Sequence, residues 1–330
     1  MRKKKKHPQK YLIYRGCFGS PMRNKPDDPD KPDMVVFCEG LCIYDDAEFG
    51  TISECMSRAL KDPTIELDMR QVTAITIRGA LILKAFFDEY AIIHNKRPKI
   101  RSPRTPKMRA VLNYIGIGHY QDVKRLHFPD IECWQIKSWD HTHENIEFSK
   151  LLHEEIIPKC WPKDHSITEH SASIATSVAE ALLNCKEHAY TGDKKLSPFK
   201  RWYLGAGEYP RTGKFALCIY DKGVGIRSRL EENPEGWFLS TIKDTLSSDS
   251  AMIELATRGR SGSDENTGGR GKGLKSAIDL LASNSGTIDI YSDRGFYSNC
   301  DDASGKDRKS RLEGTLVAFS FPLEYNKESA

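Results

Sequence analysis

Segments with strand and helix periods alternate along this chain, and this alternation constrains the fold more than any other feature. In the first third, short apolar runs are separated by longer segments whose apolar residues recur three and four positions apart. Strands separated by helices are typical of a sheet with helices packed against it. The pattern predicts strands at Met34–Glu39, Thr64–Asp68 and Pro98–Arg101, and helices at Asp45–Lys61, Arg78–His94 and Lys107–Ile115.

A second unit with its own pattern begins at Ser166. Its predicted helices are Ile174–Tyr190 and Leu274–Ser283, and its predicted strands are Lys214–Tyr220, Gly286–Tyr291 and Gly314–Pro322. The polar segment Arg294–Arg311 is predicted to be a hairpin loop. We therefore expect an α/β protein of two units: a basic tail and a Pro/Asp-rich loop (1–33), a first unit (34–125), a connector (126–165) and a second unit (166–325).

Composition excludes several classes of protein. The 50 Lys and Arg residues against 46 Asp and Glu leave a net charge of +4, too small for a globally basic nucleic-acid coat. No apolar run approaches the roughly 18–20 residues of a membrane span. Nine cysteines without C-x-x-C pairs indicate reduced thiols and hence a cytoplasmic protein. We expect no membrane association, and nucleic acid is an improbable partner.

Three polar residues lie four apart on the predicted helix Ile174–Tyr190. Glu180, Asn184 and His188 form a face beside an apolar stripe of Ile174, Val178, Ala181, Cys185 and Ala189. A carboxylate there could orient or deprotonate water, and an amide oxygen suits Mg²⁺. A solvated polar face would show the same spacing.

The turn Asp221-Lys-Gly223-Val-Gly225 directly follows a predicted buried strand. An Asp at a strand end can accept a hydrogen bond from an exocyclic amine, and glycines let the backbone approach a flat ring. An ordinary turn has the same composition.

A glycine tract precedes the predicted helix Leu274–Ser283. Its backbone N–H groups and the positive end of the helix could bind phosphates, with Arg270 and Lys272 adding charge. It matches neither the P-loop nor the Rossmann turn, and a flexible loop is the alternative.

The order of these motifs, E-x-x-x-N-x-x-x-H, D-x-G-x-G, G-x-G-x-G-L and a final Gly-Thr, resembles the Bergerat-fold (GHKL) ATPases. These include gyrase-type topoisomerases, sensor histidine kinases and anti-sigma-factor serine kinases, of which the kinases are most similar. Over residues 166–325 the resemblance implies an α/β sandwich, with a mixed sheet covered by helices on one face. A lid at about 226–268 would close over ATP.

The resemblance also implies roles for the matching residues. Asn184 would hold Mg²⁺, Asp221 would bind the adenine amine, and Glu180 would be the general base. The other residues expected at the ATP site are His188, Gly223, Gly225, Gly269, Arg270, Gly271, Lys272, Gly273, Leu274 and Thr315.

Residues 34–125 are similar to STAS domains, the fold of anti-sigma-factor antagonists, through the segments TIELD, VTAITIRGALILKAF and PKIRSPRTPKMRAVLNYIGIGHY. In those antagonists a serine just before the helix is phosphorylated. Ile77 occupies that place here, so we do not expect phosphorylation at this site. The unit would serve as a docking or regulatory module, or simply as structure.

Three functions follow as hypotheses. In the first, the chain is an enzyme that hydrolyses ATP or phosphorylates Ser/Thr of a protein partner. In the second, it is a nucleotide-gated interaction module with little turnover. The third, with least support, places it in the topoisomerase branch. A homodimer is left open. His153 resembles a phosphoacceptor histidine, but too few residues separate it from Asn184 for the usual helical hairpin.

Overall fold

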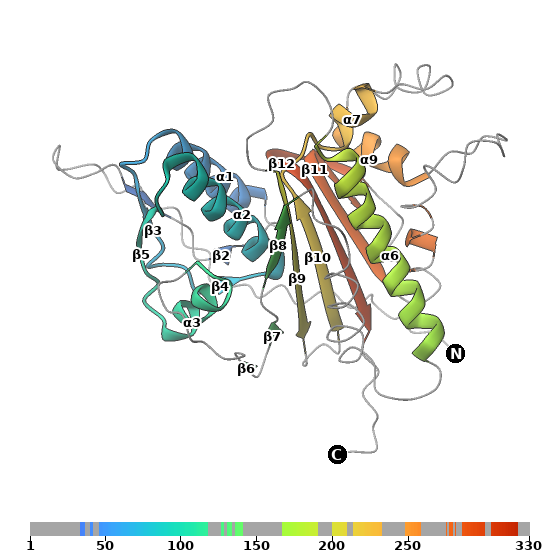
Figure 1. The fold of residues 1–330 in the computed structure, drawn as a ribbon, viewed down its shortest axis with the longest axis horizontal. Helices are drawn as coiled ribbons and strands as arrows, with labels where there is room; N and C mark the ends of the chain where they lie inside the picture. Colours follow the sequence, from blue (N-terminus) through green and yellow to red (C-terminus); the bar gives the residue numbers. More distant parts are fainter. Residues whose placement is uncertain are drawn as a thin grey trace, which may run out of the picture.

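The computed structural model describes residues 34–36, 40–41, 46–117, 127–128, 131–133, 136–140, 167–190, 200–209, 214–232, 248–258, 275, 277–279, 281, 286–300 and 305–322. Within these ranges the protein is mixed α/β, as the alternating pattern predicted (Figure 1).

The first unit contains a three-stranded parallel sheet. Its strands β1 (Met34–Val36), β3 (Glu66–Asp68) and β5 (Lys99–Arg101) pair in the order β1-β3-β5. Parallel strands need crossover connections, which helices provide here. The helices are α1 (Asp46–Lys61), α2 (Ile77–His94) and α3 (Pro106–Tyr114), and a second short parallel pair joins β2 (Gly40–Leu41) to β4 (Ala74–Ile75). Every strand and helix predicted for this unit is therefore confirmed, with ends shifted by a few residues.

The second unit is built on a seven-stranded sheet. Its path runs β11-β12-β10-β9-β7-β6, and β8 also pairs with β9. The bounds are β6 (His127–Phe128), β7 (Ile131–Cys133), β8 (Lys137–Asp140), β9 (Arg201–Tyr209), β10 (Lys214–Asp221), β11 (Thr287–Ser298) and β12 (Gly305–Pro322).

Two expectations about this sheet were wrong. Every described pair in it is antiparallel rather than mixed, because short connections join β9 to β10 and β11 to β12 as hairpins. In addition, strands β6, β7 and β8 come from residues 127–140, which we had assigned to the connector. Their short lengths left little periodicity to detect in the sequence.

The segment Arg294–Arg311 is not a loop. It contains the end of β11 and the start of β12, whose pairing continues as far as Tyr297 and Gly305 after irregularities near Asp293. Charged residues hid the strand character, because a strand with one polar face carries little apolar signal.

The sheet has a hydrophobic core on each face. On one face Phe215, Leu217 and Ile219 of β10 pack with buried side chains of helix α6 (Ile167–His188). On the other face Ala216, Cys218 and Tyr220 pack in one cluster with buried side chains of α1 and α2. This alternation follows from the two-residue repeat of a strand. Helix α6 thus covers one face, and α1 and α2 cover the other (Figure 1).

Polar contacts also cross between α2 and the sheet. The Arg78 guanidinium, only 5% exposed, lies 2.7 Å from the Asp289 carboxylate of β11 and donates to the Tyr291 hydroxyl at 3.0 Å. The Tyr203 hydroxyl of β9 donates to Asp88 at 3.2 Å. Because apolar and polar contacts are both shared, α2 is part of the core of the sheet.

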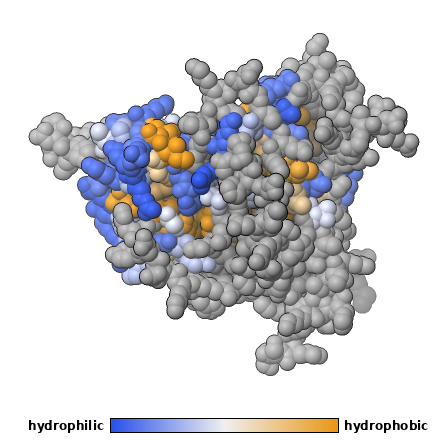
Figure 2. All heavy atoms as spheres, viewed as in Figure 1, coloured by the Kyte–Doolittle hydropathy of each residue, from blue (hydrophilic) through white to orange (hydrophobic). Residues whose placement is uncertain are grey.

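The described surface is largely hydrophilic in the view of Figure 2, with smaller apolar areas between hydrophilic ones. The large apolar side chains that are exposed in the described ranges are Ile92, Ile93 and Leu183. None of the helices in the described part of the chain combines the length and apolar character that a bilayer crossing needs.

Candidate nucleotide-binding site

Helix α6 presents the polar face that its sequence predicted. Val178, Ala181, Cys185 and Ala189 of the predicted apolar stripe are buried; the side chain of Ile174 lies outside the described ones. Glu180 and Asn184 are partly exposed and His188 is exposed. These three residues therefore lie beside the buried stripe, where a ligand can reach them.

Asp221 ends strand β10 and is 3% exposed. Its carboxylate accepts hydrogen bonds from the Gly223 N–H at 2.8 Å, from the Cys185 thiol of α6 at 3.5 Å, and from the Thr315 N–H. Burial raises the pKa of Asp221 from 3.8 to about 6, and these hydrogen bonds offset only part of that effect. Asp221 is thus a buried acceptor held against α6 through Cys185, the residue that follows Asn184 in the sequence.

The turn after Asp221 is tied to the end of α6. The Val224 N–H donates to the Ala189 carbonyl at 2.8 Å, and the Lys222 N–H donates to the Tyr190 hydroxyl at 3.1 Å. The Tyr190 hydroxyl in turn donates to the Arg201 carbonyl, and its burial raises its pKa. The spacing between α6 and this turn is therefore fixed by hydrogen bonds.

The fold itself requires both glycines of the turn. A Cβ on Gly223 would overlap the carbonyl of Ala189, the residue after α6. Gly225 has a φ of +82°, and a Cβ there would lie 2.6 Å from Asp293 Oδ2. Their expected part in lining a base pocket stays a prediction, because close packing already explains both residues.

Thr315 lies beside Asp221 across the sheet. It pairs with Asp221 of β10 on one side and with Ser292 of β11 on the other. The Ser292 and Thr315 hydroxyls are 3.3 Å apart, and Ser292 Oγ accepts from the Ile226 N–H at 2.9 Å. The sequence pattern missed Ser292 because we ended β11 at Tyr291; extending that strand by one residue would have placed Ser292 opposite Thr315.

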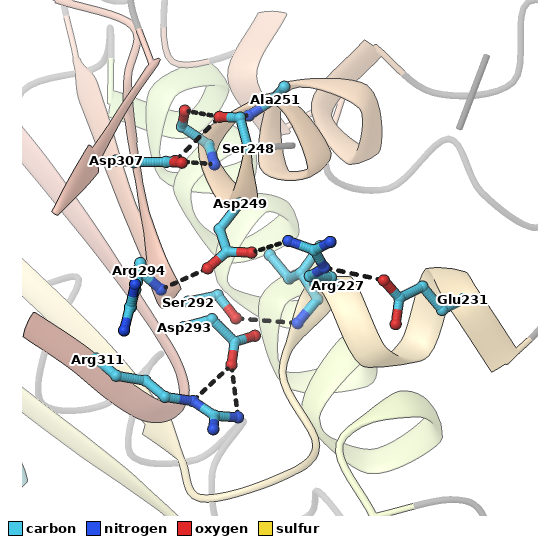
Figure 3. A network of polar contacts seen from close by, with 12 residues as sticks. Arg227, Glu231, Ser248, Asp249, Ala251, Ser292, Asp293, Arg294, Asp307 and Arg311 are labelled. Atoms are coloured by element: carbon cyan, nitrogen blue, oxygen red, sulfur yellow. Dashed lines mark hydrogen bonds and ion pairs between the residues drawn. The ribbon is translucent and has the colours of Figure 1, made fainter. Parts of the chain in front are cut away.

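A charged network lies next to Ser292, where α7, α9 and the β11–β12 hairpin meet (Figure 3). Asp249, at the start of α9 (Asp249–Arg258), lies 2.6 Å from the Arg227 guanidinium of α7 (Ile226–Glu232) and accepts from the Arg294 N–H at 3.0 Å. Asp293 pairs with Arg311 at 2.9 Å, and burial raises its pKa. The network fixes α7 and α9 to the β11–β12 hairpin.

Helix α9, which falls within the predicted lid, therefore belongs to the hydrophobic core. Met252 and Ile253 of α9 are at most 1% exposed, and Ile253 packs in the same cluster as α6. A buried helix anchored by Asp249 is not free to close over a ligand, so 248–258 does not belong to a mobile lid. Helix α7 has no buried residue and is held to α9 by the Arg227–Asp249 ion pair.

The predicted phosphate-binding residues Gly269, Arg270, Gly271, Lys272, Gly273 and Leu274 lie outside the described residues. Just after them, residues 275, 277–279 and 281 are helical, and Ala277 and Leu281 are buried. The helix expected after the glycine tract is thus present.

Ile77, which the resemblance to STAS antagonists would put in place of the phosphorylated serine, is 8% exposed. It follows Thr76, whose hydroxyl caps α2 by accepting from the Gly79 N–H at 3.1 Å. It packs against Gly205 of β9, where a Cβ would lie 3.2 Å from Ile77 Cγ2. This position is covered by the sheet of the second unit.

Comparison of the chain with protein-family models gives no match, and a search of curated proteins gives none either. The interpretation of the site therefore depends on its residues and their geometry.

Proposed function

We propose that this protein binds Mg·ATP in a site of the Bergerat (GHKL) type. The observation that carries the proposal is the buried Asp221 carboxylate, held between the Cys185 thiol of α6 and the Thr315 N–H of β12. Carboxylates are seldom buried without a cationic partner, and carboxylates with a shifted pKa cluster at functional sites. An acceptor at a strand end suits an exocyclic amine. Asn184, adjacent in α6, is partly exposed and offers an amide oxygen.

The residues fit such a ligand in chemistry. Asp221 would accept the adenine amine, with Thr315 beside the base, and Asn184 would contribute one oxygen to Mg²⁺, which usually keeps phosphate oxygens and water as its other ligands. Bound ATP would supply a γ-phosphoryl group for transfer. Glu180, one helical turn from Asn184, would deprotonate or orient the attacking water or hydroxyl group.

The proposed enzyme activity is ATP hydrolysis or phosphoryl transfer to a protein Ser/Thr; a nucleotide-gated module with little turnover is the alternative. In either case the STAS-like unit at 34–125 would be regulatory, because α1 and α2 share a core with the sheet that carries Asp221 and Thr315. The free thiols of Cys55, Cys185, Cys218 and Cys300 are in keeping with a reducing cytoplasm.

Calorimetry with ATP and GTP, with and without Mg²⁺, tests the binding proposal. We expect binding of ATP over GTP, and loss of this preference in Asp221→Asn. Equal affinities for the two nucleotides in the wild type would refute the role of Asp221.

An assay with radiolabelled ATP then distinguishes an enzyme from a nucleotide-gated module. Wild type should release or transfer labelled phosphate, and Glu180→Gln should bind ATP without doing so. If the wild type binds ATP but releases no labelled phosphate and labels no co-purifying protein, the nucleotide-gated module is the correct function.

A further inference from the structure

Lys222 connects the candidate nucleotide site with the first unit. Successive residues of a strand point to opposite faces. Asp221 contacts α6 on one face, whereas the Lys222 ammonium forms an ion pair with Glu89 of α2 on the other. One peptide bond therefore joins the residue proposed to bind adenine to a side chain anchored in the STAS-like unit.

The Lys222 side chain is held by carboxylates. It is 8% exposed, and Glu89 is 7% exposed. Glu313 of β12 lies 3.0 Å from the same ammonium but is 70% exposed. Since salt and water screen an exposed charge far more than a buried one, Glu89 is the stronger anchor.

The backbone around Lys222 has little freedom to adjust. Its N–H donates to the Tyr190 hydroxyl, and the following Gly223 N–H donates to Asp221. Across the sheet, a Cβ on Gly314 would overlap the Asp221 carbonyl, so β12 also lies directly against this turn. A shift of Lys222 would therefore move the Asp221 carboxylate and the Gly223 N–H with it.

We propose that Glu89 is a positioning residue for the nucleotide site: through Lys222, α2 of the STAS-like unit holds the Asp221–Gly225 turn in its binding geometry. A partner or modification that displaces α2 would change nucleotide affinity by this route. This inference rests on the proposed ATP site, because it assigns the STAS-like unit a regulatory contact with that site.

Glu89→Gln tests the proposal, with Asp88→Asn as a matched control. Asp88 is the neighbouring residue of α2 and also contacts the sheet, through Tyr203, but it does not touch Lys222. We expect Glu89→Gln to weaken Mg·ATP binding about tenfold and Asp88→Asn to leave it unchanged. Glu313→Gln, at an exposed position that spares the fold, should give a smaller loss.

A double-mutant cycle tests whether Glu89 acts through Lys222. Lys222→Met should weaken binding, and adding Glu89→Gln should weaken it no further, because coupled residues are non-additive. Additive losses, or unchanged affinity in Glu89→Gln, would overturn the proposal.

Amide hydrogen exchange gives a readout that needs no nucleotide. Exchange at Gly223 and Val224 should accelerate in Glu89→Gln and not in Asp88→Asn, while Ile290 in β11 is unaffected in both. If the wild type binds no ATP, the proposed function fails, and the exchange result still decides the positioning. Unchanged exchange at Gly223 and Val224 would overturn it.

Discussion

Asp221→Asn should change how the stability of the protein depends on pH. Burial raises the pKa of Asp221 from 3.8 to about 6 in the folded chain. The folded chain therefore binds this proton more tightly than the unfolded chain. Its contribution to stability is fully present below about pH 3.8 and is lost as pH rises through 6. Asparagine has the same shape and does not titrate, so this pH dependence should disappear in the variant.

The expected magnitude follows from the pKa difference. A rise of about two units corresponds to about 3 kcal/mol of lost stability once Asp221 is ionised. Between about pH 4.5 and 7.5, ionisation of Asp221 in the unfolded and folded chains accounts for roughly 2 kcal/mol of this loss of stability. The free energy of unfolding of Asp221→Asn should thus rise by about 2 kcal/mol relative to wild type across that range. Hydrogen bonds that the variant loses lower its free energy of unfolding by the same amount at both pH values, so they do not alter this change.

Urea unfolding at several pH values measures this difference, and Asp68→Asn is the control. Asp68 also ends a strand and is 3% exposed, but its hydrogen bond from Arg70 lowers its pKa. Its stabilisation is present above pH 3.8 and is lost as pH falls below that value. The difference between wild type and Asp68→Asn should therefore stay nearly constant between about pH 4.5 and 7.5 and change only at lower pH. A pH-independent difference between wild type and Asp221→Asn would refute the reasoning about Asp221.

Three further substitutions test the site and the shared core. Asn184→Ala should abolish Mg²⁺-dependent ATP binding; unchanged affinity by calorimetry would show that the metal role was misassigned. Arg78→Met leaves the Asp289 carboxylate without its buried partner and should cost about 3–5 kcal/mol in urea unfolding, so a loss below about 1 kcal/mol would mean that this ion pair does not stabilise the interface. Gly314→Ala places a Cβ against the Asp221 carbonyl at a φ of +82° and should cost more than about 2 kcal/mol, whereas wild-type thermal stability would contradict the close packing.

The features of the fold that the sequence predicted arise from residues close together in the chain. The helix period gave α1, α2 and α6, and the apolar stripe of α6 is buried at every position whose side chain is described. The turn at Asp221–Gly225 was visible as a strand followed by spaced glycines. The hairpin between β11 and β12 was predicted, but the extension of both strands into Arg294–Arg311 was missed, because charged residues such as Lys306, Lys309 and Arg311 are exposed there and leave little apolar period.

The sequence by itself predicted the order of the longer helices and strands, and it proposed Glu180, Asn184, Asp221 and Thr315 as site residues, since period and composition are properties of neighbouring residues. Only the tertiary structure decided that α1 and α2 cover the second face of the sheet. It also decided that Arg78 pairs with a carboxylate 211 residues away, and that Glu89 and Lys222, which are 133 residues apart, are buried as an ion pair. Contacts at such separations leave no local period, because they arise only when the packed faces meet.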